Sequence, residues 1–229
     1  MVRATSVVIE PLGASDAGRV GGKAAGLARM VELGLPVPPA LVVPVGAEID
    51  DVSAFAELGE PLAVRSSAVG EDARERSAAG QYETILGVGV DGLKEAIERV
   101  RASTERAAAY GGSDDVAVVV QRQVPATKAG VAFSRDPTTG DDACVVECAF
   151  GSGDAVVSGE TVPDRFRILG GRVTARVAGP LRTLRDDELQ EIVALVARAE
   201  EGFGYPVDVE FCFERRRLWL VQCRAITTL

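Results

Sequence analysis

The C-terminal part of the chain carries the pattern that most constrains the fold. Residues 186–203 repeat apolar side chains every three or four positions, as an amphipathic helix does, at Leu189, Ile192, Val193 and Val196. Residues 207–213 and 218–226 then alternate in polarity with the period of two that is typical of strands. A helix followed directly by two strands requires a fold that mixes α and β elements.

The rest of the chain repeats this mixture of short strands and a few helices. One helix pattern follows Gly22, and a second covers residues 91–110, where one stripe is formed by Leu93, Ile97, Val100 and Thr104. Further strands are predicted over 5–9, 61–66, 82–88, 116–124, 129–134 and 143–149, with a hairpin over 165–177. We therefore predict an α/β or α+β fold.

Length and composition suit one large domain or two small lobes around a cleft. The chain has 229 residues, of which 47% are hydrophobic, so it can bury a sizeable core. Glycines precede the strand over 116–124 and mark a lobe boundary near residues 111–122. We assign residues 1–115 to an N-terminal lobe and residues 116–229 to a C-terminal lobe.

Charge and residue usage exclude several classes of function. The formal net charge of −9 argues against binding to nucleic acid or to an anionic membrane. The absence of histidine excludes Ser/His/Asp triads and histidine-ligated metals. Four cysteines without CxxC spacing and an N-terminus without a signal-peptide core are typical of a cytoplasmic protein, which we expect here. ATP stays compatible with this composition, since it needs only a local basic cluster and a metal.

Two basic residues stand where a phosphate could bind. Lys23 follows Gly21 and Gly22 at a helix entry, where glycine N–H groups and the helix terminus favour an anion, although this is also an ordinary helix entry. The spacing is not that of a Walker motif. Arg65 ends an apolar strand, where a guanidinium usually meets a carboxylate or a phosphate. A structural ion pair is the alternative for Arg65.

The last hairpin is the most informative candidate site. Strand alternation places Leu220, Gln222 and Arg224 on one face, and Glu210 on a face of the preceding strand. Together Glu210, Gln222 and Arg224 would offer oxygen ligands for Mg²⁺ and a cation for the phosphates it bridges. Glu210 lies opposite Gln222 if the loop has an odd number of residues, such as three. The alternative is a solvated polar face.

Three further segments are candidates for the same site. Gly80 and Gln81 could place flexible backbone over phosphates. The strand edge from Gln121 to Val124 could pair with an adenine base. Glu147 follows an apolar strand and precedes a glycine turn, so it could face the cleft. Each of them alone is also compatible with a structural role.

Taken together, these segments resemble the nucleotide-binding domain of the pyruvate phosphate dikinase and phosphoenolpyruvate synthase family. The matching runs, in family order, are GGKAAGLARMVELGLPVPPALVV, LAVRSSAVGED, SAAGQYET, VVVQRQVPATKAGVAFSRDPTTG, VVSGETVPDRFRI, FGYPVDVEF and LWLVQCRAIT. They span nearly the whole chain. The resemblance implies an ATP-grasp-like fold in which two α/β lobes clasp ATP.

The resemblance also implies roles for the candidate residues. Lys23, Arg65 and Arg224 would be the catalytic phosphate contacts. Glu210 and Gln222 would bind Mg²⁺. The remaining positions would complete the ATP site: Gly80 and Gln81 on the phosphate lid, Gln121 and the backbone near Val124 at the adenine, and Glu147 in the cleft.

The family's reaction sends the β-phosphate of ATP to a histidine on a separate domain and releases the terminal phosphate, so that AMP forms. This chain has no histidine, and the stretches between Lys23 and Arg65 and between Val88 and Val116 are shorter than in the family. We predict an ATP-dependent phosphotransferase with a histidine-bearing partner or a small acceptor. The alternatives are a regulatory module that binds Mg-ATP without turnover, a piece of a longer enzyme, and an interaction protein that no longer binds ATP.

Overall fold

The computed structural model divides the chain into two compact units, and the chain passes from one to the other three times. Unit 1 contains residues 1–29 and 38–123, and unit 2 contains residues 30–37 and 124–229. The structure describes residues 10–11, 17–69, 83–108, 116–152, 162–177 and 182–227. Within these ranges no helix is both long and apolar enough to cross a membrane.

Unit 1 is built on a five-stranded antiparallel sheet with the order β1-β2-β5-β3-β4. Its strands are β1 (Glu10–Pro11), β2 (Ala40–Val43), β3 (Leu62–Ala68), β4 (Thr84–Val88) and β5 (Val116–Arg122). Its helical elements are α1 (Ala17–Glu32, which ends in unit 2), α2 (Leu93–Ala108) and the short 3-10 turns Ser53–Leu58 and Val90–Gly92.

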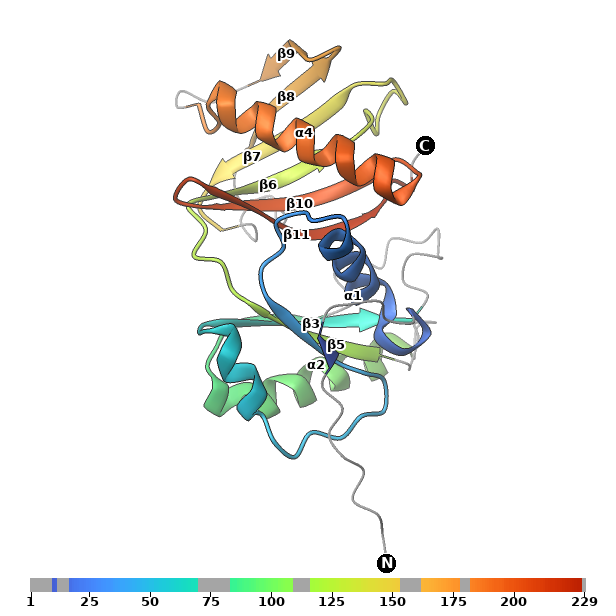
Figure 1. The fold of residues 1–229 in the computed structure, drawn as a ribbon, viewed down its shortest axis with the longest axis vertical. Coiled ribbons are helices and arrows are strands. Elements are labelled where there is room, and N and C mark those ends of the chain that lie inside the picture. Colours follow the sequence, from blue (N-terminus) through green and yellow to red (C-terminus); the bar gives the residue numbers. More distant parts are fainter. Residues whose placement is uncertain are drawn as a thin grey trace, which may run out of the picture. The chain divides into compact units, whose positions relative to one another are not determined.

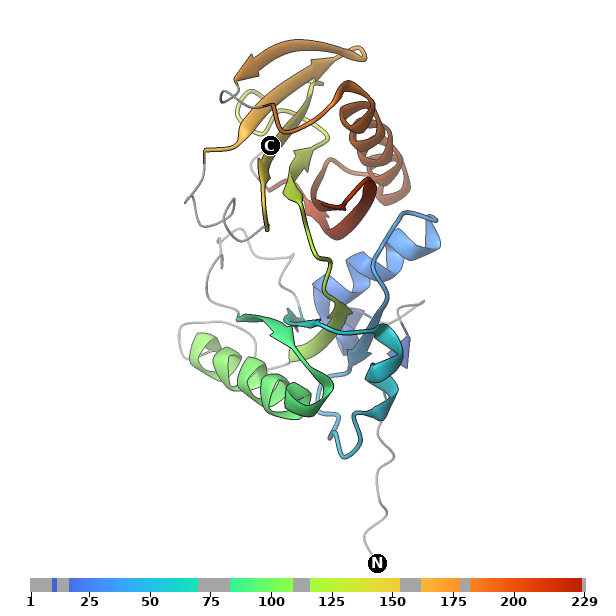
Figure 2. The ribbon, with the colours of Figure 1, turned by 90° about the vertical axis from the view of Figure 1, so that its left-hand side faces the viewer.

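The two faces of this sheet carry different side chains. Strand alternation turns Leu62 and Val64 of β3 toward a core that they share with the apolar stripe of α2, including Leu93 and Ile97. The opposite face carries Ala63, Arg65 and Ser67, and the first part of α1 lies on that side (Figures 1 and 2). The α2 side is therefore the apolar core, and the α1 side holds the polar candidates.

Unit 2 is a six-stranded antiparallel sheet with the order β11-β10-β6-β7-β8-β9. The strands are β6 (Lys128–Phe133), β7 (Cys144–Phe150), β8 (Asp164–Leu169), β9 (Arg172–Val177), β10 (Val207–Glu214) and β11 (Arg217–Ala225). Helix α4 (Asp186–Phe203) crosses one face of this sheet (Figure 1). It buries Leu189, Ile192 and Val196 there, as the helical pattern predicts.

The mixed α/β prediction is confirmed, with strands that are antiparallel throughout both sheets. The predicted boundary at residue 115 differs from the observed division, because β5 does not open the second lobe. It lies between β2 and β3 in the sheet of unit 1 and pairs with both. The break therefore follows Gln123. The predicted strand over residues 5–9 lies outside the described residues.

Candidate functional site

The glycine turn before Lys23 is a break inside α1. Gly21 has φ 75° and ψ 172°, so the helix is interrupted there and resumes at Gly22. Only glycine fits, because a Cβ on Gly21 would lie 2.1 Å from the carbonyl oxygen of Ser67. Lys23, in the first turn of the resumed helix, is half-buried. The predicted feature, a lysine at a helix start behind glycines, is thus present.

Arg65 and Gln121 lie on the α1 side of the same sheet. Arg65 is half-buried in the middle of β3 and pairs across to Thr84 and Val119. Gln121 lies in the row formed with Ala63, and its side chain is 3% exposed. Its Nε2 donates a long hydrogen bond of 3.4 Å to the Pro38 carbonyl oxygen. Unit 1 therefore presents Lys23 and Arg65 on the same side of its sheet.

The β10–β11 hairpin brings Glu210 opposite Gln222, as predicted, but by a different route. The turn has two residues, Arg215 and Arg216, because Glu214 already pairs with Arg217. The odd residue is supplied by a β-bulge between the pairs Glu210–Gln222 and Phe211–Leu220. The prediction of a three-residue loop is therefore wrong, whereas the predicted pair is correct.

Because of the bulge, the predicted face of Leu220 in β11 is wrong. Leu220 pairs with Phe211, and both are fully buried on the face away from Glu210. Simple alternation had placed Leu220 on the same face as Gln222 and Arg224. Because the extra residue, Val221, shifts the register by one, the polar side chains separate from the apolar ones. A face with paired polar residues results.

A second polar pair stands beside the first. Arg224 lies opposite Asp208. Its Nε donates a hydrogen bond of 2.9 Å to Asp208 Oδ2, and its Nη2 lies 2.9 Å from the same oxygen. Asp208 is 6% exposed, and its other oxygen, Oδ1, is buried with no hydrogen-bond partner among the described residues. Burial raises the pKa of Asp208, the Arg224 charge opposes this, and Glu210 adds to it.

Glu147 lies in the same row of the sheet as the first pair. Glu210 pairs with Val131 of β6, and Val131 pairs with Glu147 of β7. Directly paired residues point to the same face, so Glu147 and Glu210 share a face with one strand between them. Arg165 Nε lies 3.5 Å from Glu147 Oε1, which gives Glu147 a partner on β8. The structure thus brings Glu147, Glu210 and Gln222 onto one face.

The remaining predicted positions have other outcomes. Val124 packs against the cluster of Ala129, Cys212 and Trp219 at the start of unit 2. Gly80 and Gln81 lie outside the described residues. No group of three or more His, Cys, Asp or Glu side chains with metal-binding geometry occurs in the part of the chain that the structure describes.

Sequence reasoning missed the roles of two residues. Asp208 was visible on the Glu210 face, but only the structure shows that it holds Arg224. Ser67 binds the turn before Lys23 and follows Arg65 by two positions on the same strand. The signal for Asp208 was its alternation with Glu210. The sequence offers no signal for the role of Ser67 beyond its place two positions after Arg65.

Comparison with known proteins identifies the family of the chain. The family described as pyruvate phosphate dikinase, AMP/ATP-binding domain, matches residues 45–179 and 170–229. A rifampicin phosphotransferase from a Streptomyces species is 38% identical over 213 aligned positions, covering 77% of this chain and 25% of that protein. A prodigiosin synthesizing transferase, PigC of Serratia marcescens, is 32% identical over 283 positions, covering 92% of this chain and 32% of that protein.

Solved structures show the fold. D-alanine–D-alanine ligase from Bacillus anthracis in complex with ATP has a TM-score of 0.54 at 12% identity, covering 89% of this chain and 54% of that chain. A dinucleotide-forming acetyl-coenzyme A synthetase from Ca. Korarchaeum cryptofilum has a TM-score of 0.56 at 12% identity, covering 88% of this chain and 90% of that chain. The fold is ATP-grasp-like.

This chain matches only part of each of these two relatives. The chain spans between a quarter and a third of the rifampicin phosphotransferase and PigC. The PigC alignment has more positions than the 229 residues of this chain, so PigC carries residues that this chain lacks inside the matched region. The shorter stretches noted in the sequence are consistent with this. The family match covers most of the chain, and the chain belongs to the pyruvate phosphate dikinase AMP/ATP-binding domain family.

Proposed function

We propose that this chain binds Mg-ATP and transfers a phosphoryl group from it, with AMP and phosphate as the other products. The observation that carries the proposal is the polar face of unit 2. There Glu210 and Gln222 are paired, Arg224 is held by Asp208, and Glu147 lies in the same row. Oxygen ligands next to an oriented guanidinium are what a metal-bound polyphosphate requires.

The donor set fits Mg²⁺. Glu210 and Gln222 offer carboxylate and amide oxygens, and Asp208 Oδ1 is a buried oxygen that lacks a partner among the described residues. Such a buried carboxylate oxygen is costly unless something binds it. Mg²⁺, when bound, would supply positive charge to the phosphate oxygens. We assign Glu210 and Gln222 as its ligands.

Unit 1 supplies the other phosphate contacts in this proposal. Lys23 and Arg65 carry positive charge on the α1 side of the five-stranded sheet, and Lys23 sits at a helix start. Electrostatic neutralisation by these groups is the main means of lowering the barrier to phosphoryl transfer. Gln121 and Val124 remain our assignments for the adenine, and Gly80 and Gln81 for the phosphate lid.

The phosphoryl acceptor must lie outside these 229 residues if it is a histidine, because they contain none. Relatives are named rifampicin phosphotransferase and probable phosphoenolpyruvate synthase. We propose a histidine on a partner chain or domain, or a small molecule, as the acceptor. We further propose a cytoplasmic location, where ATP is available.

Phosphorus NMR of the protein with ATP and Mg²⁺ tests the proposal, with and without inorganic phosphate and a cell extract as the source of acceptor. AMP with released phosphate is the expected result. ADP alone would refute the dikinase reaction. Lys23→Ala and Arg224→Ala should lower affinity or turnover, whereas Lys94→Ala and Arg172→Ala, which remove exposed charges elsewhere in each unit, should not. Glu210→Gln should mainly change the Mg²⁺ dependence.

A regulatory nucleotide-binding module is the second candidate. The observation that favours it is that these 229 residues contain no histidine that could accept the phosphoryl group. Such a module would shift and broaden the ATP signals without converting ATP. Unperturbed ATP signals would contradict both candidates.

A further inference from the structure

The turn before Lys23 is hydrogen-bonded to β3 through one side chain, that of Ser67. Ser67 Oγ donates a hydrogen bond of 2.6 Å to the Val20 carbonyl oxygen and accepts one of 3.0 Å from the Ala24 N–H. Ser67 is completely buried. A third bond, from Val45 N–H to the Arg19 carbonyl oxygen at 3.0 Å, holds the start of the same turn.

This arrangement replaces a missing helix cap. A helix normally begins with a residue whose side-chain oxygen accepts the N–H of the second or third helical position. The helix that resumes after the break is preceded by Gly21, which has no side chain to do so. Ser67 performs the same task from a different element, since Ala24 is the third residue after Gly21.

Ser67 also ties the turn to the strand that carries Arg65. The two residues are two positions apart on β3 and therefore point to the same face of the sheet. At Gly21 the turn packs directly on the Ser67 backbone, since a Cβ added there would lie 2.1 Å from the Ser67 carbonyl oxygen. Strand β3 thus sets the place of both Lys23 and Arg65.

We propose that Ser67 is a positioning residue that fixes the Lys23 turn for contact with the phosphates of ATP. The inference rests on the proposed function of Lys23 but adds a residue to it. Loss of the hydroxyl leaves the Ala24 N–H and the Val20 carbonyl oxygen buried without their partner. The turn should then sample other conformations, and Lys23 should contact phosphate for a smaller fraction of the time.

A double-mutant cycle on ATP affinity tests this, because it separates an effect through Lys23 from a general loss of structure. Ser67→Ala should weaken binding of Mg-ATP, measured by calorimetry, by about tenfold, the size of one lost hydrogen bond. In a Lys23→Ala background the same change should weaken binding by less than about twofold. Ser67→Thr, which keeps the hydroxyl, should restore most of the affinity.

Ser103→Ala is the matched control, because Ser103 is also a buried serine of unit 1 and its Oγ donates to the Val100 carbonyl oxygen within α2. It should leave ATP affinity unchanged. An equal loss for Ser67→Ala in both backgrounds, or no loss in either, would overturn the proposal. If Ser67→Ala does not fold, Ser67→Cys, which keeps the size but hydrogen-bonds weakly, takes its place with the same expected outcomes.

Amide hydrogen exchange supplies a readout that does not depend on ATP. Exchange at Ala24 should accelerate about tenfold in Ser67→Ala and stay unchanged in Ser103→Ala, as expected for loss of one hydrogen bond. An unchanged rate at Ala24 would overturn the positioning role by itself. If Ser67→Ala accelerates exchange at Ala24 but the wild-type protein does not bind ATP, the structural role of Ser67 is supported and the proposed function is refuted.

Discussion

Replacing Lys128 by methionine should strongly destabilise unit 2. Lys128 Nζ lies 2.5 Å from Glu188 Oε2, between β6 and the first turn of α4, and the two residues are 9% and 3% exposed. Lys128 also lies over the Phe213 ring, 4.9 Å from its centroid. Methionine fills a similar space but leaves the Glu188 carboxylate buried without its cation.

The size of the effect follows from the surroundings of Glu188. Removal of one partner of a buried ion pair costs about 3–5 kcal/mol. Arg185 reduces this cost, because its Nη2 lies 3.2 Å from Glu188 Oε1 and its N–H donates to Glu188 Oε2. We therefore expect about 3 kcal/mol, near the lower end of that range. This corresponds to a urea midpoint lowered by about 1.5 M for a typical slope of about 2 kcal/mol per molar.

Tryptophan fluorescence measures this loss in unit 2 alone. The chain has one tryptophan, and Trp219 is 5% exposed in β11, with its Nε1 donating to Glu214 Oε2 at 3.1 Å. Unfolding of unit 2 should expose the ring and shift its emission to longer wavelength. A urea titration followed at this signal therefore reports the stability of the sheet that contains Lys128.

Two matched variants complete the experiment. Lys128→Met combined with Glu188→Gln should recover much of the stability, because no buried charge remains while the Arg185 N–H keeps an acceptor. Arg135→Gln removes the partly exposed pair with Glu200 and should cost less than about 1 kcal/mol. A midpoint shift below about 0.5 M for Lys128→Met would refute the reasoning, since it would show that water replaces the lost cation.

Three further changes test other parts of unit 2. Gly130→Ala should destabilise it by about 1–3 kcal/mol in the same urea titration, because the new Cβ would lie 1.9 Å from the Glu147 carbonyl oxygen; an unchanged midpoint would contradict this contact. Arg215→Gly should raise stability by about 1 kcal/mol, because Arg215 has a left-handed φ of 58°, and a lower midpoint would show that the arginine side chain matters more. Arg224→Gln should raise the pKa of Asp208 further in carbon NMR titrations, since the Arg224 charge lowers it. An acid whose folded pKa exceeds its unfolded pKa stabilises the folded state only while it is protonated. The stability of this variant should therefore fall as the pH rises from about 4 through the raised pKa of Asp208, and a stability that does not change with pH would contradict this.

The local pattern predicted most of the elements. Residues 186–203 form α4 with the bounds expected, and the predicted strands over 207–213 and 218–226 are β10 and β11 within a residue or two. These segments were predictable because periodicity records which side chains turn toward a core, whatever that core contacts. Boundaries differ where the last residues of a strand still find a pairing partner, as at Glu214 and Arg217.

Register was harder to predict than strand position. The pairing of Glu210 with Gln222 was expected from a three-residue loop, but it arises from a two-residue turn and a bulge at Val221. Both routes give the same pair, and only one of them separates Leu220 from the polar face. A bulge leaves no periodic signal, because a single extra residue simply restarts the alternation.

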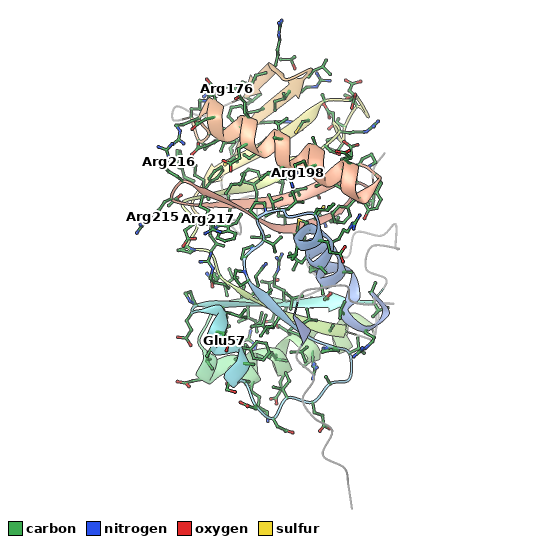
Figure 3. All side chains as sticks on the ribbon, in the orientation of Figure 1. Glu57, Arg176, Arg198, Arg215, Arg216 and Arg217 are labelled. Atoms are coloured by element: carbon green, nitrogen blue, oxygen red, sulfur yellow. The ribbon has the colours of Figure 1, made fainter. Side chains whose placement is uncertain are left out.

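Side-chain surroundings were also not predictable from the sequence. Figure 3 shows Arg215, Arg216 and Arg217 at the tip of this hairpin. Three consecutive arginines look alike in the sequence but have different surroundings. Arg217 lies over the Trp219 ring at 3.8 Å, whereas Arg216 Nη2 approaches Asp187 Oδ2 at 3.8 Å. Their contacts depend on which side of the strand and turn each one leaves.

The sequence by itself determined the element types, the family resemblance and the residue types of the candidate site, because these depend on local periodicity and on runs of neighbouring residues. Tertiary structure decided which of those residues meet. It placed β5 in the sheet of unit 1, set Asp208 against Arg224, and let Ser67 cap a helix more than 40 positions away in the chain. Such contacts join residues distant in sequence, and their partners are chosen by packing and by the need to satisfy buried polar groups, which no local pattern encodes.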